Sequence, residues 1–197
     1  MISYGKQSIN QDDIDAVVDV LKSDFLTQGP KVVEFENDLA NYCEAKYAKA
    51  VNSGTAALHL AYLAIGLEQG DIVWTTPNTF VATANAALYC GATVDFVDID
   101  PKTYNLSIDY LKEKLIQAKK DNKLPKLVVP VHFAGQSCEM KAIWKLSKEY
   151  GFKVIEDASH AIGGKYKNET IGNCRYSDIT VFSFHPVKII TTGEGGV

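Results

Sequence analysis

The chain has 197 residues, 46% of them hydrophobic, and a formal net charge of −4. These values predict one soluble globular domain with a substantial core, and the mild acidity argues against nucleic acid as a main partner. No apolar run approaches the length of a bilayer span and the first residues do not form a signal peptide, so we expect a cytoplasmic protein without a membrane partner. The four cysteines form no C-x-x-C pair, which argues against zinc and predicts no bound metal.

Two amphipathic helices are predicted in the first part of the chain. The first begins after Asn10, a capping residue, and runs through Ser23. Its apolar positions are Ile14, Val17, Val18 and Leu21. A loop over residues 24–30 ends in a Gly-Pro pair, which breaks regular structure. The apolar face of the second helix comprises Val32, Phe35, Leu39 and Tyr42. We expect both helices to pack on the rest of the domain or on a partner.

Short β-branched segments then alternate with helical ones. Strands are predicted at residues 48–51, 72–75, 93–97, 127–131, 153–156 and 179–184. Helices are predicted at residues 55–67, 80–90, 108–119 and 139–150. A small hairpin within residues 163–172 is predicted to turn at Lys167 and Asn168. Strands separated by helices predict an α/β fold with a mostly parallel sheet that is covered on both faces.

The strands of a parallel sheet all end at one edge, where ligands bind. Residues 52–57 follow the first predicted strand. Gly54 permits close approach of the backbone, and the helix start at Thr55 and Ala56 offers N–H groups to an anion such as a phosphate. Ser53 as an ordinary helix cap explains the same residues equally well.

Two further segments end at this edge. Phe80 follows the second predicted strand and could stack on a flat ring, although a single phenylalanine is more often part of the core. Asp157 follows an apolar strand and could pair with a ring N–H and keep it protonated. Its alternative role is to cap the following turn. His160 could donate a hydrogen bond to a ring oxygen, or it could contact only the residues that touch the ligand.

The last predicted strand leads to Ser183 and then, past a proline, to Lys188. A lysine at this position can be a Schiff-base nucleophile if apolar walls or nearby cations lower its pKa, whereas a lone lysine is more often a solvated turn residue. Ser183 could bind a phosphate. A phosphate cradle, a ring stacker, an acid for a ring nitrogen and a Schiff-base lysine together indicate a pyridoxal phosphate (PLP) site.

With these residues in place, the chain resembles the DegT/DnrJ/EryC1/StrS family of sugar-nucleotide aminotransferases over essentially its whole length. Residues 4–9, 23–30, 130–136 and 182–188 resemble, more narrowly, the C4 aminotransferases of pseudaminic acid biosynthesis. The resemblance implies the PLP-dependent transferase fold of type I, which is aspartate aminotransferase-like. Residues 1–30 would be an N-terminal helix and substrate-loop segment, and residues 31–197 a PLP-binding large domain truncated at its C-terminal end, without the small C-terminal domain.

The resemblance also implies roles for single residues. Lys188 would be the catalytic residue that forms the Schiff base and moves the proton. Asp157 would pair with the pyridine nitrogen, Phe80 would stack on the ring, and His160, where the family often has glutamine, would lie by the ring hydroxyl. The phosphate or the adjoining substrate would be bound by Gly54, Thr55, Ala56 and Ser183. The sugar nucleotide would be faced by Tyr4, Asp24, Phe25, Leu26 and Thr27.

The implied reaction moves an amino group from L-glutamate to C4 of a UDP-4-keto-6-deoxy-N-acetylhexosamine, in an enzyme that is a homodimer. A sugar dehydratase on the same scaffold carries histidine at the Schiff-base position, so Lys188 argues against it. Another amino sugar, of the perosamine or 4-amino-arabinose type, stays open because the motifs bind the cofactor and not the sugar. An inactive fragment or binding module also stays open. An NAD enzyme is excluded because no G-x-G-x-x-G follows the first strand.

Overall fold

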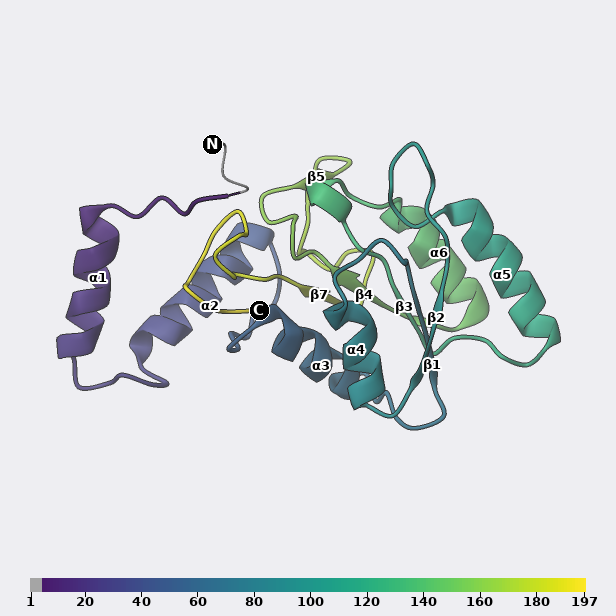
Figure 1. Cartoon of the computed structure of the whole chain (residues 1–197), viewed down its shortest axis with the longest axis horizontal. Helices are drawn as coiled ribbons and strands as arrows, with labels where there is room; N and C mark the ends of the chain where they lie inside the picture. Colours follow the sequence, from purple (N-terminus) through teal and green to yellow (C-terminus); the bar gives the residue numbers. More distant parts are fainter. Residues whose placement is uncertain (1–4) are drawn as a thin grey trace.

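The centre of the molecule is a five-stranded parallel sheet with the strand order β2-β1-β3-β4-β7 (Figure 1). This computed structural model describes residues 5–197, so Tyr4 lies outside the described residues. The strands are β1 (Ile72–Thr75), β2 (Thr93–Phe96), β3 (Leu127–Val129), β4 (Lys153–Asp157) and β7 (Ile179–Val181). All neighbouring strands in this order run parallel, which confirms the predicted α/β fold.

Helices cover the sheet on both faces, as predicted (Figure 1). The helices of these two layers are α3 (Gly54–Ala64) and α4 (Ala82–Tyr89) on one face, and α5 (Ile108–Lys120) and α6 (Met140–Tyr150) on the other. Successive residues of a strand point to opposite faces. Val73 and Val129 accordingly join the core under α3 and α4, whereas Trp74 and Val128 join the core under α5 and α6.

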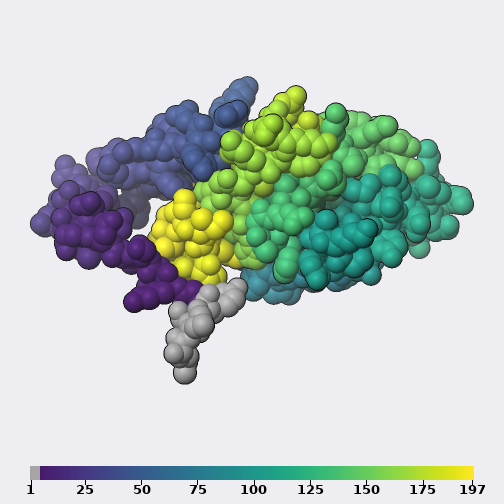
Figure 2. Space-filling view, turned by 90° about the horizontal axis from the view of Figure 1, so that it is seen from above, coloured from purple at the N-terminus to yellow at the C-terminus, as the bar shows by residue number. Residues whose placement is uncertain are grey.

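Helix α1 (Gln11–Lys22) forms where the sequence predicts it, but its apolar face does not pack on the domain. Asn10 accepts from the amide of Asp13 at 3.1 Å, and the Asp13 carboxylate accepts from the amide of Asn10 at 2.9 Å, which is a capping box. None of its residues is buried, and Val17, in the middle of the predicted apolar face, is 60% exposed. Figure 2 shows α1, in purple, at one end of the molecule.

Helix α2 (Pro30–Cys43) packs on the C-terminal part of the chain. Phe35 meets Phe184 edge to face at 5.4 Å between ring centroids. Tyr42, which we assigned to the buried face, is 57% exposed, and this assignment is wrong. Cys43 takes the buried position instead, because it lies four residues after the buried Leu39 and so returns to the same side of the helix.

The strand predicted at residues 48–51 does not form. Val51 alone makes a β-bridge, to Gly196. Residues 195–197 are also bonded on their other side, where the amide of Phe182 donates to the Val197 carbonyl at 2.8 Å. A strand needs a ladder of partners, and the short 195–197 segment supplies one pairing to Val51. Beyond it, an apolar cavity of about 520 Å³ separates residues 45–51 from β7, and its walls include Leu39, Ala57, Leu60, Ala61, Val181 and Phe182.

The small hairpin lies where the sequence predicts it. Strands β5 (Lys165–Tyr166) and β6 (Glu169–Thr170) pair antiparallel, and both turn residues, Lys167 and Asn168, have positive φ values of 48° and 70°. Such a pair is typical of the tight turns that join two strands. A short 3₁₀ turn, η1 (Phe133–Gly135), follows β3. None of the described helices combines the length and apolar character that a bilayer crossing requires.

Candidate active site

Three of the predicted site residues, Asp157, Ser183 and Gly54, meet where β4 and β7 end and α3 begins. Asp157 is the last residue of β4 and is paired with Val181 of β7. Ser183 follows β7 and touches the start of α3, because a Cβ atom built on Gly54 would lie 2.9 Å from Ser183 Cβ. The edge rule for parallel sheets therefore places the predicted phosphate residues and the predicted acid at one edge.

The start of α3 can hold an anion. Ser53 caps the helix, since its Oγ accepts from the Ala56 amide at 3.1 Å, so the capping role that the sequence left open is real. The cap engages one N–H group, and the N–H groups of Gly54 and Thr55 are at positions that have no acceptor within a helix. These groups, together with the helix dipole, favour a phosphate beside the Ser183 hydroxyl.

The carboxylate of Asp157 is 4% exposed and is held on both oxygens. Oδ1 accepts from the Ser159 hydroxyl at 2.6 Å and from the Ser159 amide at 3.2 Å, which is the predicted turn cap. Oδ2 accepts from the Thr83 hydroxyl at 2.6 Å. A carboxylate offers about four acceptor sites, so one site on Oδ2 remains for a further donor, such as the N–H of a pyridinium ring.

Lys188, His160 and Asp157 act on one another electrostatically. Burial lowers the pKa of the half-buried Lys188 amine below its ordinary value, and the Asp157 carboxylate opposes this shift. Burial also lowers the pKa of His160, and the positive charge of Lys188 lowers it further against the effect of Asp157. These effects place the three groups within electrostatic range of one another. A less readily protonated amine is what a nucleophilic lysine needs.

Phe80 lies two residues before α4 and is 71% exposed, so it is not a core residue. Its carbonyl accepts from the Thr83 amide at 3.1 Å. The backbone of Phe80 is therefore held close to Thr83, whose hydroxyl bonds Asp157. This placement suits a ring that stacks on a flat ligand.

The predicted substrate loop lies elsewhere. Figure 1 shows the connection between α1 and α2, which carries the loop, at the end of the molecule away from the ends of β4 and β7. The loop residues are Asp24, Phe25, Leu26 and Thr27. Phe25 and Leu26 are exposed. Within one chain the structure does not bring this loop to the pocket.

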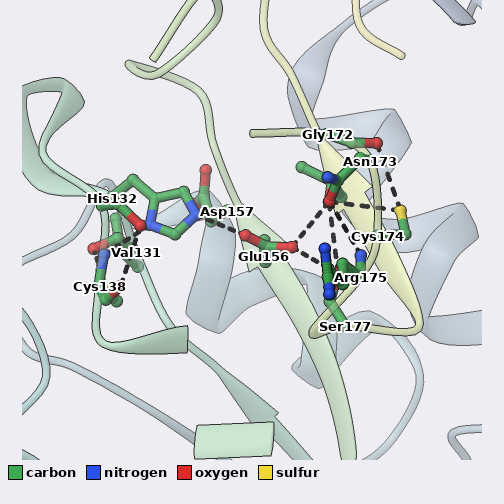
Figure 3. A network of polar contacts seen from close by, with 12 residues as sticks. Val131, His132, Cys138, Glu156, Asp157, Gly172, Asn173, Cys174, Arg175 and Ser177 are labelled. Atoms are coloured by element: carbon green, nitrogen blue, oxygen red, sulfur yellow. Dashed lines mark hydrogen bonds and ion pairs between the residues drawn. The ribbon is translucent and has the colours of Figure 1, made fainter. Parts of the chain in front are cut away.

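A buried polar network surrounds Glu156, the residue before Asp157, at the end of β4 (Figure 3). Figure 3 shows Glu156 between His132 on one side and Ser177 on the other. The Glu156 carboxylate accepts from His132 Nε2 at 2.7 Å, from the Thr180 hydroxyl at 3.0 Å and from the Ser177 hydroxyl. Burial raises the pKa of Glu156, but these hydrogen bonds outweigh burial and hold it below its ordinary value.

His132 lies between two hydrogen-bond partners. Burial lowers the pKa of the ring, but its interactions with Cys138 and Glu156 outweigh burial and raise it to about 10. The amide of Cys138 donates to Nδ1 at 3.1 Å, so the ring presents the N–H of Nε2 to Glu156. The amide of His132 donates to the Asp157 carbonyl at 3.0 Å. The network thus fixes the backbone at the end of β4.

Sequence reasoning missed Thr83, Ser159 and the partners of Glu156. Ser159 had a local signal, since a serine two residues after an aspartate often returns a hydrogen bond to it. Thr83 had a weaker one, a hydroxyl four residues after that of Thr79. Its bond to Asp157 spans 74 residues, and no pattern within a segment encodes it.

The chain is similar to known proteins over nearly its whole length. The model of the DegT/DnrJ/EryC1/StrS aminotransferase family matches residues 7–197. The chain is 47% identical over 196 residues to UDP-4-amino-4,6-dideoxy-N-acetyl-β-L-altrosamine transaminase of Campylobacter jejuni, covering 100% of this chain and 50% of the relative. It is 40% identical over 197 residues to GDP-perosamine synthase of Caulobacter vibrioides, covering 100% and 51%.

Solved structures show the same similarity. The chain is similar to Helicobacter pylori PseC, an aminotransferase involved in the biosynthesis of pseudoaminic acid, with a TM-score of 0.90, 38% identity and coverage of 98% of this chain and 50% of the other. The PLP form of a candidate sugar aminotransferase from Streptococcus pneumoniae matches with a TM-score of 0.88 and 30% identity, covering 99% and 52%. The chain spans about half the length of the curated relatives it matches.

Proposed function

Because the chain belongs to the DegT/DnrJ/EryC1/StrS aminotransferase family, whose members use PLP, we propose that it is the cofactor-binding part of a sugar-nucleotide aminotransferase. The observation that carries the proposal is the junction of the start of α3, Ser183 and Asp157 at the ends of β4 and β7. When bound, PLP supplies the electron sink that stabilises negative charge on the carbon that loses its proton.

The residues present fit this cofactor. The free N–H groups of Gly54 and Thr55 and the hydroxyl of Ser183 would hold the phosphate. The remaining acceptor site on Asp157 Oδ2 would take the ring N–H, and Asp157 would keep that nitrogen protonated. Phe80 would stack on the ring from the start of α4. Ala56 and His160 remain predicted contacts, of the phosphate end and of the ring hydroxyl respectively.

Lys188 carries the proposed proton transfer. The lowered pKa leaves more of its amine neutral near neutral pH than in a solvated lysine, so Nζ can accept a proton from a substrate carbon and return it to another. A negative charge on Asp157 acts on the Lys188 amine and would stabilise its ammonium form between the two transfers.

We infer that the substrates are L-glutamate and a UDP-4-keto-6-deoxy-N-acetylhexosamine, as in pseudaminic acid biosynthesis. The similarity to the Campylobacter jejuni transaminase supports this choice. The similarity to a GDP-perosamine synthase keeps another amino sugar as the second candidate. Because residues at the pocket bind the cofactor rather than the sugar, the assignment of the sugar depends on segments outside the pocket.

We also propose that the working enzyme is a homodimer. The exposed apolar face of α1 and the exposed Phe25 and Leu26 form a surface that a second copy would cover. The substrate loop at residues 24–27, remote from the pocket of its own chain, would then reach the pocket of its partner. All four cysteines are free thiols, which suits a cytoplasmic location.

The test offers the full-length enzyme a panel of UDP- and dTDP-4-keto sugars with L-glutamate. We expect amination at C4 of the UDP-4-keto-6-deoxy-N-acetylhexosamine, identified by NMR of the product, and formation of 2-oxoglutarate in equal amount. Preference for a GDP- or dTDP-linked sugar would replace the substrate assignment. Failure of the full-length enzyme to bind PLP would refute the proposed function itself. The 197-residue chain assayed alone would show whether it is an inactive fragment.

A further inference from the structure

Thr83 is a buried polar residue outside the predicted site that touches the predicted acid. It lies in the first turn of α4 with its side chain fully buried. Its Oγ1 is 2.6 Å from Asp157 Oδ2. Because a carboxylate only accepts, the hydroxyl proton of Thr83 is committed to Asp157.

This commitment fixes the direction of a second hydrogen bond. Thr79 Oγ1 lies 2.7 Å from Thr83 Oγ1, and either hydroxyl could donate if the pair stood alone. Thr83 has one proton and gives it to Asp157, so Thr79 must be the donor to Thr83. Two hydroxyl groups therefore point in series at one carboxylate oxygen, and each donor strengthens the next in such a chain.

The backbone of Thr83 is held as firmly as its side chain. Its amide donates to the Phe80 carbonyl at 3.1 Å, and its carbonyl accepts from the Tyr62 hydroxyl at 2.9 Å. Tyr62 is fully buried in α3, and burial raises the pKa of its hydroxyl, which therefore stays protonated as a donor. Thr83 thus joins the helix of the phosphate end, the ring-stacking Phe80 and the acid at the end of β4.

We propose that Thr83 is a positioning residue that holds Oδ2 of Asp157 for the cofactor ring nitrogen, and that Thr79 acts through it. Ser159 holds the other oxygen, so Thr83 is the side chain that sets how Oδ2 meets a ring donor. Without the Thr83 hydroxyl, Oδ2 loses its short hydrogen bond and the carboxylate can turn about its Cβ–Cγ bond. The inference rests on the proposed PLP-dependent function.

The test compares three variants of the full-length protein. Thr83→Val removes the hydroxyl and keeps nearly the same shape, Thr83→Ser keeps the hydroxyl, and Thr79→Val removes only the outer donor. We expect Thr83→Val to weaken PLP binding about tenfold or more, Thr83→Ser to bind within about threefold of the wild type, and Thr79→Val to fall between. We also expect Thr83→Val to shift the pH at which the absorption spectrum of the bound cofactor changes, and Thr83→Ser to restore it.

The double variant separates positioning from simple loss of packing. Since Thr79 acts through Thr83, adding Thr79→Val to Thr83→Val should weaken PLP binding no further. Wild-type affinity and an unshifted spectrum in Thr83→Val would overturn the proposal. So would additive effects in the double variant. If Thr83→Val does not fold, Thr79→Val is measured alone and in the Thr83→Ser background. We expect it to weaken PLP binding equally in both, because both keep the Thr83 hydroxyl, and unequal weakening would overturn the proposal.

A measurement without cofactor keeps this inference separate from the proposed function. In the cofactor-free protein we expect a slowly exchanging Thr83 hydroxyl proton in the NMR spectrum, lost in Asp157→Ala. Its absence from the wild type would overturn the inference whatever PLP does. A wild type that shows this proton but binds no PLP would refute the proposed function. The Thr83–Asp157 hydrogen bond would then be purely structural, and the proposed role of Thr83 toward the cofactor would be overturned.

Discussion

Gly196 and Val51 exchange two backbone hydrogen bonds, of 2.8 and 2.9 Å, although 145 positions, the difference between their numbers, separate them in the chain. Gly196 also bridges Ser183. It therefore joins the segment that leads into α3 to the segment that follows β7, which are the two sides of the proposed phosphate site. A side chain at Gly196 would overlap the carbonyl of Ser53, so this junction requires glycine.

We expect Gly196→Ala to lower the free energy of unfolding by about 1–3 kcal/mol, because the new methyl group meets backbone atoms that cannot turn aside. Binding of PLP to the full-length protein should weaken as the two sides of the phosphate site separate. Urea denaturation and PLP titration measure the two effects. Gly5→Ala is the control, since a Cβ there has no neighbour within 4 Å. Equal stability of the two variants would contradict the prediction.

Lys188→Ala in the full-length enzyme should abolish transamination and leave the fold intact. The side chain is half-buried, and its amine makes no hydrogen bond to the described part of the chain. We therefore expect the melting temperature to change by only about a few degrees. Circular dichroism and a glutamate-dependent assay measure the two. Lys188→Arg is the matched control, because a guanidinium keeps the charge but does not lose its proton. An active Lys188→Ala enzyme would end the proposed mechanism.

The reactivity of Lys188 should depend on pH in a direction set by its surroundings. Burial lowers the pKa of its amine below 10.5, and Asp157 raises it. The rate at which trinitrobenzenesulfonate labels Lys188, followed by mass spectrometry, should therefore reach half its maximum below pH 10.5. Asp157→Asn removes the opposing charge and should move this midpoint further down. An upward shift in Asp157→Asn would contradict the electrostatic effect of Asp157 on Lys188.

Glu156→Gln should destabilise the fold at neutral pH by about 1–3 kcal/mol, because the amide nitrogen would face a hydroxyl or ring donor. The pKa of Glu156 is lower in the folded than in the unfolded state, so its carboxylate contributes stability above pH 4.5, and this contribution is lost as the pH falls through the folded value. The variant should therefore lose less stability than the wild type on acidification, measured by urea denaturation at several pH values. The exposed Glu113→Gln serves as control, and identical acid profiles of wild type and Glu156→Gln would contradict this prediction.

The sequence predicts the layers and the site edge well, because both follow from local patterns. The order of strands and helices fixes a parallel sheet, and the rule that its strands end at one edge brings Asp157, Ser183 and Gly54 together. The strand at residues 48–51 fails because its formation depends on a neighbour and not on its own β-branched residues.

Other errors have the same origin. The face of α2 was misplaced by one position because Tyr42 and Cys43 are both apolar and only packing selects between them. No sequence pattern assigns the Thr83 hydroxyl to Asp157, because the pattern that predicts helix α4 does not depend on this hydroxyl. The loop at residues 24–27 lies away from the ends of β4 and β7 in Figure 1, so its role toward a substrate stays a prediction.

The apolar cavity beside β7 has a consequence for handling the chain. Its walls are mostly apolar, and it adjoins β7, the edge strand of the sheet, where backbone groups can pair with another strand. Such a surface favours edge-to-edge self-association as the protein concentration rises. The net charge of −4 is small, so charge repulsion between molecules opposes this association only weakly. Light scattering against concentration will reveal it before any assay does.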